Sequence, residues 1–212
     1  MMMTGRWRIA AILAMAGSFS ILTFLVWNGD TINFDIALRN WALGFNNAIS
    51  VTVWEDISLM GSVAVISTLT FLSLGLFVVR SDWGAARQLA LAMCGAVGFD
   101  ISTKWIVHRP RPDEVYAHTM PTTYSFPSGH ALYGFVFYLT IAAIVTRRSL
   151  GNGIWGVWGS AITIAILIGV SRIFLGVHYG SDVLGGYLIA AIWLIILWTP
   201  TDTDKPRSVS QD

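Results

Sequence analysis

Residues 128–146 read SGHALYGFVFYLTIAAIVT; they contain no Asp, Glu, Lys or Arg, and the run stops at Arg147 and Arg148. A helix that crosses the hydrocarbon core of a bilayer needs roughly 20 mostly apolar residues, because each helical residue rises by about 1.5 Å. The stretch has that length and composition, so it predicts a membrane-spanning helix.

Five further runs share this character. They cover residues 9–27, 60–79, 88–107, 152–171 and 183–199. Within them only Asp100 and Lys104 carry a charge. The first run is too long for a signal peptide, so we expect it to remain as a span. The sequence therefore predicts an all-α polytopic membrane protein with six transmembrane helices in one bundle, which residues 1–200 form as a single domain.

The composition excludes several other classes of protein. Of the 212 residues, 55% are hydrophobic and 12% are charged, whereas soluble domains carry about 25% charged residues. A formal net charge of +1 provides no basic surface for nucleic acid, so we expect no nucleic-acid partner. The single cysteine, Cys94, excludes a disulfide scaffold.

The basic residues predict an orientation, because Lys and Arg concentrate in cytoplasmic segments. With the N-terminus inside, the inner segments hold eight of the 13 basic residues: Arg6, Arg8, Arg80, Arg87, Arg147, Arg148, Lys205 and Arg207. The outer side holds the others: Arg39, Lys104, Arg109, Arg111 and Arg172. We therefore expect a multi-pass protein of the inner (plasma) membrane with both termini in the cytoplasm.

Residues 28–56 join the first two spans and contain a helical pattern. Apolar residues recur at spacings of four, three and four: Phe34, Leu38, Trp41 and Phe45. Polar residues lie off this stripe: Asp35, Arg39 and Asn46. The pattern predicts a short amphipathic helix, either lying in the outer membrane interface or packing against the spans. The polar, proline-interrupted tail, residues 201–212, is expected to be disordered.

Three polar clusters remain in or beside the apolar runs. They are Lys104–Pro112 (KWIVHRPRP), Pro127–His130 (PSGH) and Ser171–Asp182 (SRIFLGVHYGSD). In the predicted topology the third and fifth spans end, and the fourth and sixth begin, on the outer side. All three clusters are therefore expected at one outer end of the bundle.

The clusters contain the elements of an anion site. Lys104, Arg111 and Arg172 would place three positive charges near one point, where they repel one another unless a counter-charge lies between them. Ser128 and Gly129 open a helix, whose unpaired backbone N–H groups and dipole favour an anion. Guanidinium forks match phosphate oxygens. The pattern predicts a phosphate site that needs no divalent metal and no cofactor, because the basic residues neutralise the charge.

Two histidines and a carboxylate would add reactivity to this site. His178 and Asp182 are four residues apart, so we expect them on one helix face. A carboxylate on one ring nitrogen leaves the other nitrogen free to act as a nucleophile. His130, from a different span, is placed to protonate a leaving oxygen and then to deprotonate a water. Such a pairing predicts displacement at phosphorus through a phosphohistidine.

The combined pattern Lys-x6-Arg-Pro, Pro-Ser-Gly-His and Ser-Arg-x5-His-x3-Asp resembles the signature of the type 2 phosphatidic acid phosphatase superfamily, over about residues 60–200. The resemblance implies a six-helix, metal-independent hydrolase of lipid phosphates and diphosphates, including phosphatidic acid, phosphatidylglycerophosphate and undecaprenyl diphosphate, with an outward-facing site. It implies that His178 is the nucleophile, Asp182 its partner and His130 the general acid and base. The residues that it implies for holding the phosphoryl oxygens are Lys104, Arg111, Ser128, Gly129 and Arg172.

Several alternatives stay open at this point. A lipid phosphotransferase would use the same intermediate with a hydroxyl acceptor, and an anion channel or transporter would use the basic residues without the histidines. Asp100 lies one turn before Lys104 and is expected to pair with it. His108 and Arg109 lie off the motif positions, where they could face headgroups or a second phosphate. The expected partners are the lipid substrate and membrane lipids, with no obligate protein partner.

Overall fold

Helices account for most of the chain in the computed structural model, which describes residues 5–113, 123–147, 151 and 153–198. Over these residues the helices are α1 (Gly5–Trp27), α2 (Ile32–Leu43), α3 (Ala48–Leu59), α4 (Val63–Val79), α5 (Trp83–Val107), α6 (Gly129–Thr146), α7 (Gly153–Phe174) and α8 (Gly180–Leu197). The predicted disorder of residues 201–212 concerns a segment outside the described residues. The all-α fold class is confirmed.

Six helical stretches of the described chain are long and apolar enough to cross a membrane, as predicted. The second is longer than expected, because α3 and α4 together form one stretch, Ala48–Val79. A break at residues 60–62 separates the two helices, and the Ser62 side chain caps α4 by accepting a hydrogen bond from Val65 N at 3.2 Å. Part of the predicted outer connection therefore belongs to the second span.

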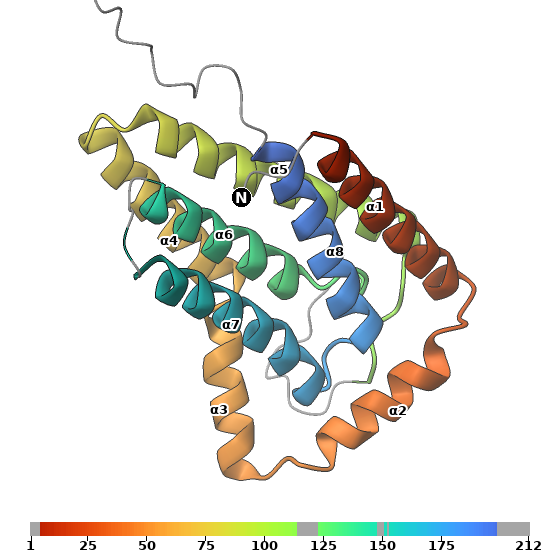
Figure 1. Cartoon of the computed structure of the whole chain (residues 1–212). Coiled ribbons are helices and arrows are strands. Elements are labelled where there is room, and N and C mark those ends of the chain that lie inside the picture. The colour runs from red at the N-terminus through yellow and green to blue at the C-terminus, as the bar shows by residue number, and fades with distance from the viewer. Residues whose placement is uncertain (1–4, 114–122, 148–150, 152, 199–212) are drawn as a thin grey trace, which may run out of the picture.

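Helix α6 forms the centre of the bundle and contacts α4, α5, α7 and α8 (Figure 1). Its Leu132 and Val136 are fully buried together with Leu89 of α5 and Ala190 of α8. Small residues let neighbouring helices approach closely, and a Cβ at Gly134 would lie 3.1 Å from the Ile168 side chain of α7. This packing fixes the depth at which α6 begins.

The short helix α2 lies across the end of the bundle where α7 and α8 meet, and it contacts both of them (Figure 1). Asp35 and Ala42 are buried, whereas Phe34, Trp41 and Phe45 are 63%, 57% and 59% exposed. The predicted helix is therefore present and packs against the spans, through a mixed face on which Asp35 lies beside Leu38 and Ala42. Its aromatic side faces outward, and its place in the membrane interface stays a prediction.

Four spans have an end on the side of the bundle that α2 covers (Figure 1). Helices α5 and α7 end on this side and α6 and α8 begin on it, with α7 and α8 next to α2. This is the arrangement that the alternation of apolar runs predicts, and it brings the three polar clusters to one end of the bundle.

Candidate active site

Backbone hydrogen bonds join the three clusters. Helix α5 stops at His108, whose left-handed backbone (φ 51°) turns the chain while its N–H bonds Lys104 O at 3.0 Å. Ser125 N donates to Arg109 O at 2.9 Å, and Ser128 N donates to Asp182 O at 3.0 Å. The first cluster is thus tied to the segment that leads into the second, and the second is tied to the third.

His178 and Asp182 form a buried pair in which the exposed fractions are 1% and 0%. The Nδ1 atom of His178 lies 3.3 Å from Asp182 Oδ2, so the predicted contact is confirmed. The prediction that both residues lie on one helix face is wrong, because His178 precedes α8 and Asp182 lies in the first turn of that helix. Asp182 Oδ2 also accepts the N–H of Tyr179 at 2.9 Å. This capping contact brings the carboxylate back to the imidazole.

The environment of His178 keeps its imidazole neutral. Burial lowers the pKa of His178 to about 3, against the opposing hydrogen bond with Asp182, and the nearby Arg111 cation lowers it further. A carboxylate at Nδ1 favours the tautomer that carries its proton there, which leaves the lone pair on Nε2. Arg111 Nη1 lies 3.1 Å from that Nε2 atom. Near neutral pH the nitrogen that faces the basic residues is therefore unprotonated.

Lys104 reaches the start of α6 from the last turn of α5. It is 8% exposed and pairs with Asp100, as predicted. Tyr133 OH donates to the second oxygen of Asp100 at 2.7 Å, which holds the carboxylate from the other side. A Cβ added at Gly129 would lie 3.4 Å from Lys104 Nζ. The ammonium group of Lys104 thus lies directly beside the N-terminus of α6.

The remaining predicted residues surround the same point. Ser128 is the N-cap of α6 and is fully buried, and its Oγ has no hydrogen-bond partner among the described residues. Arg172, in the last turn of α7, donates to Ser58 Oγ of α3. His130 lies in the first turn of α6. It is within electrostatic range of four residues: Lys104, Arg111, Arg172 and His178. The structure therefore brings all eight predicted site residues together.

Sequence reasoning missed part of the site around Arg109. This side chain is 7% exposed and forms ion pairs of 2.6 Å with both Asp35 and Asp182. It therefore faces neither lipid headgroups nor a second phosphate. Arg109 is buried beside the carboxylate that contacts His178, and it also pairs with a second carboxylate, that of Asp35. The sequence signal for this second partner was the polar side of the predicted amphipathic helix. Ser125, whose Oγ donates to Asp182 Oδ2, had no comparable signal. His108 is exposed and packs edge-to-face on Tyr124.

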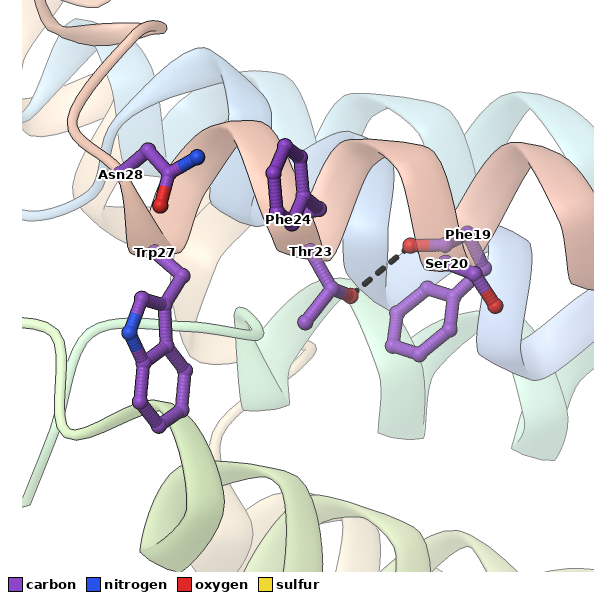
Figure 2. Close-up of a pocket in the computed structure, with 6 residues that line it drawn as sticks. All are labelled: Phe19, Ser20, Thr23, Phe24, Trp27 and Asn28. Carbon is purple, nitrogen blue, oxygen red and sulfur yellow. Dashed lines mark hydrogen bonds between the residues drawn. The ribbon is translucent and has the colours of Figure 1, made fainter.

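Two apolar hollows lie along the spans, one beside α5 and one beside α1. One, of about 490 Å³, lies between α4 and α5 and is lined by residues that include Ile66, Met93, Cys94 and Tyr133. The other, of about 470 Å³, runs along the second half of α1, where Phe19, Thr23 and Trp27 point to the same side (Figure 2). Both hollows lie within membrane-spanning stretches, where lipid chains are the surrounding solvent.

The donor chemistry of the site is cationic. Across the described residues no group of three or more His, Cys, Asp or Glu side chains is arranged to hold a metal ion. Lys104, Arg111 and Arg172 instead supply N–H donors and positive charge beside an unprotonated imidazole nitrogen. Such a site can bind a tetrahedral oxyanion and present a nucleophile to its central atom.

Known proteins resemble the chain in sequence. A phosphatidylglycerophosphatase B of Bacillus subtilis is 31% identical over 126 residues, which are 58% of this chain and 61% of that protein. An undecaprenyl-diphosphatase of Sulfolobus acidocaldarius is 34% identical over 86 residues, which are 41% of this chain and 37% of that protein. The matched part is thus less than two thirds of either relative.

Solved structures share the fold. A transmembrane PAP2-type phosphatidylglycerolphosphate phosphatase from Bacillus subtilis superposes with a TM-score of 0.80 at 25% identity, covering 88% of this chain and 93% of that one. LpxE of Aquifex aeolicus superposes with a TM-score of 0.59 at 24% identity, covering 77% and 94%. The model of the PAP2 superfamily matches residues 85–205, which carry all three clusters. The chain is an integral membrane protein that belongs to the PAP2 superfamily.

Proposed function

We propose that this protein is a membrane lipid phosphatase that hydrolyses phosphomonoester or diphosphate headgroups through a phosphohistidine. The observation that carries the proposal is the buried neutral imidazole of His178, backed by Asp182 and facing Arg111. A structural histidine does not require an unprotonated nitrogen directed toward a cluster of cations. The names of the sequence relatives point to phosphatidylglycerophosphate and undecaprenyl diphosphate as substrates, and phosphatidic acid belongs to the same class.

In the first step Nε2 of His178 attacks phosphorus. The N–P bond forms as the P–O bond to the leaving group breaks, and His130, which enters this step as the imidazolium, gives its proton to the departing oxygen. Asp182 stabilises the imidazolium that develops, and Lys104 and Arg172 neutralise charge on the phosphoryl oxygens. In the second step His130 takes a proton from water, the hydroxide oxygen bonds to phosphorus, and the N–P bond breaks. His178 and His130 then return to their starting states, and no step requires a metal ion.

The apolar tail of the substrate would stay at membrane depth while the headgroup reaches the cations. The hollow between α4 and α5 supports this arrangement, because Tyr133 lines the hollow and also binds Asp100, the partner of Lys104. One side chain thus borders both the apolar space and the charged site. We further propose that residues 1–200 act as one domain in the inner (plasma) membrane, with cytoplasmic termini and the site at the outer face.

Phosphate release from detergent-solubilised protein tests the proposal. Phosphatidic acid, phosphatidylglycerophosphate and undecaprenyl diphosphate form the substrate panel. His178→Ala should abolish release because the N–P bond cannot form. His108→Asn is the control, since that exposed ring lies outside the site and asparagine tolerates the left-handed backbone of residue 108. Turnover that survives His178→Ala would reject the nucleophile, and loss of wild-type activity in EDTA would reject the metal-free mechanism.

Two measurements separate the alternatives from hydrolysis. A phosphotransferase would move radiolabelled phosphate onto an acceptor lipid instead of releasing it to water. A channel or transporter would pass phosphate across vesicles without cleaving a phosphate ester.

A further inference from the structure

A chain of buried charges runs from α2 to the histidine pair. Asp35, Arg109 and Asp182 are 0%, 7% and 0% exposed, and they alternate in sign. Arg109 Nη2 lies 2.6 Å from Asp35 Oδ2, and Arg109 Nη1 lies 2.6 Å from Asp182 Oδ1. None of the motif positions includes Asp35 or Arg109. Two carboxylates and a guanidinium are costly to bury unless every partner is placed well.

Asp35 is fully engaged by its neighbours. Its Oδ1 accepts the backbone N–H of Ser181 at 2.9 Å, and its Oδ2 accepts Ser181 Oγ at 2.6 Å in addition to Arg109. The N–H of Ser181 is one of the first in α8, where helix N–H groups lack a partner inside the helix. Asp35 therefore caps α8 from another helix and fixes Arg109 relative to that cap.

Arg109 is held on each of its sides. Besides the two carboxylates it donates to Ser181 Oγ at 2.7 Å, and its guanidinium carbon lies 4.3 Å from the centre of the Tyr179 ring. Burial alone would lower the pKa of Arg109, but Asp182 and Asp35 raise it, so the side chain stays charged. A fixed cation on Asp182 Oδ1 determines how the carboxylate is oriented.

The two oxygens of Asp182 have separate tasks as a result. Oδ1 faces Arg109, whereas Oδ2 faces His178 Nδ1 at 3.3 Å together with Ser125 and the N–H of Tyr179. Rotation of the carboxylate would weaken the Nδ1 contact that selects the imidazole tautomer. A group that prevents this rotation keeps the lone pair on Nε2.

We propose that Asp35, acting through Arg109, is a positioning residue that orients Asp182 and thereby holds His178 in its Nδ1-protonated form. The inference rests on the proposed function, in which His178 Nε2 is the nucleophile. It assigns a role in the chemistry to α2, an element outside the three motifs and outside the residues that the family model matches.

The alternative is that the three charges only fasten α2 to α8. In that case a change at Asp35 would reduce the amount or thermal stability of the protein, while molecules that remain folded would turn over normally. The phosphate-binding residues are not hydrogen-bonded to Asp35 among the contacts of the described residues. A positioning role therefore predicts a change in kcat with little change in KM.

The first test compares Asp35→Asn with wild type, with Asp82→Asn as the matched control. Asp82 pairs with Arg147 in a partly exposed ion pair where α5 begins, at the other end of that helix from the site. Asp35→Asn should lower kcat by about 10-fold to 100-fold, the size of the effect that follows loss of the hydrogen-bond partner that orients a metal-binding histidine. The KM of Asp35→Asn should stay within about twofold of the wild-type value, because among the described residues Asp35 forms no hydrogen bond with the phosphate-binding residues. A twofold change corresponds to less than about 0.5 kcal/mol of binding free energy. Asp82→Asn should keep both constants.

The second test does not depend on turnover. In protein labelled with [15N]histidine, loss of signals in His178→Gln identifies the ring nitrogens of His178. Wild type and Asp82→Asn should give the nitrogen chemical shifts of the Nδ1-protonated tautomer. Asp35→Asn and Arg109→Met should move both chemical shifts toward the average of the two tautomers.

The outcomes separate the two hypotheses. Unchanged His178 shifts in Asp35→Asn, or a kcat within twofold of wild type, would overturn the positioning role and leave the phosphatase proposal standing. A wild-type protein that cleaves no lipid phosphate of the panel would reject the phosphatase proposal, while the nitrogen shifts would still decide whether Asp35 controls the tautomer.

Discussion

At the scale of single residues, His178 contributes to the acid sensitivity of the fold. Burial, more than any other cause, lowers the pKa of His178 to about 3 in the folded protein. In an unfolded chain the pKa of histidine is about 6.5. Between these values the unfolded chain binds the additional proton, so the folded state is favoured most above pH 6.5 and loses stability as the pH falls toward 3.

We predict that the thermal midpoint falls more steeply with acid in wild type than in His178→Gln. At pH 5, protonation of the histidine in the unfolded chain lowers the free energy of unfolding by about 2 kcal/mol, and glutamine takes up no such proton. Unfolding scans in detergent at pH 7.5 and pH 5 measure the difference. Equal decreases in the two proteins would mean that His178 is not held neutral.

The absence of a side chain at residue 129 bears on substrate binding. A Cβ there would lie 3.3 Å from the Tyr133 ring and 3.4 Å from Lys104 Nζ. We predict that Gly129→Ala raises KM for lipid phosphates by roughly tenfold, because the Tyr133 ring must move away from the new Cβ and its hydrogen bond to the Asp100 carboxylate, the partner of Lys104, is weakened. Loss of such a charge-assisted hydrogen bond costs about 1.5 kcal/mol. Gly156→Ala on α7 meets nothing within 4 Å and is the control. An unchanged KM would show that the Tyr133 ring can adjust without cost.

At the scale of helices, the sequence predicted what a local pattern determines. Bilayer thickness requires long apolar runs, so the spans were recognisable, whereas their ends depend on caps such as Asp82, which starts α5 earlier than predicted. The pairing of Lys104 with Asp100 follows from helical spacing. The pairing of Arg109 with Asp35 joins residues 74 positions apart, and no periodicity connects them. His178 and Asp182 meet through a helix cap, not along a helix face.

Cys94 provides a test of the hollow between α4 and α5, because it lines that space and is the only cysteine in the sequence. We predict that labelling Cys94 with a bulky alkyl methanethiosulfonate raises KM for long-chain lipid phosphates. Water-soluble short-chain substrates should be hydrolysed as before, since the cations are untouched. The same reagent on Cys94→Ala should have no effect. Equal inhibition of long and short substrates would place the tail elsewhere.

At the scale of the whole molecule, the polar clusters gather at one end because the six spans alternate in direction along the chain. The orientation of that end relative to the cell rests on the distribution of Lys and Arg. It can be tested with exposed positions at the two ends of the bundle. Asn40 lies on α2 beside the site, and Gly151 lies in the connection between α6 and α7.

In a Cys94→Ser background, we predict that a membrane-impermeant maleimide labels Asn40→Cys in intact cells. Gly151→Cys should react only after the cells are permeabilised, because its loop adjoins Arg147 on the side predicted to be cytoplasmic. The reverse labelling pattern would show that the protein has the opposite orientation, with the site at the cytoplasmic face.

The buried carboxylate on α2 limits how the protein can be divided or recombined. Residues 85–205 match the family model, yet the oxygen that completes the surroundings of Arg109 comes from residue 35. A chimera that joins the motif-bearing portion of this chain to the first helices of a relative must supply an acidic group at the same place. Without such a group, the chimera would bury the Arg109 guanidinium with only one of its two carboxylate partners.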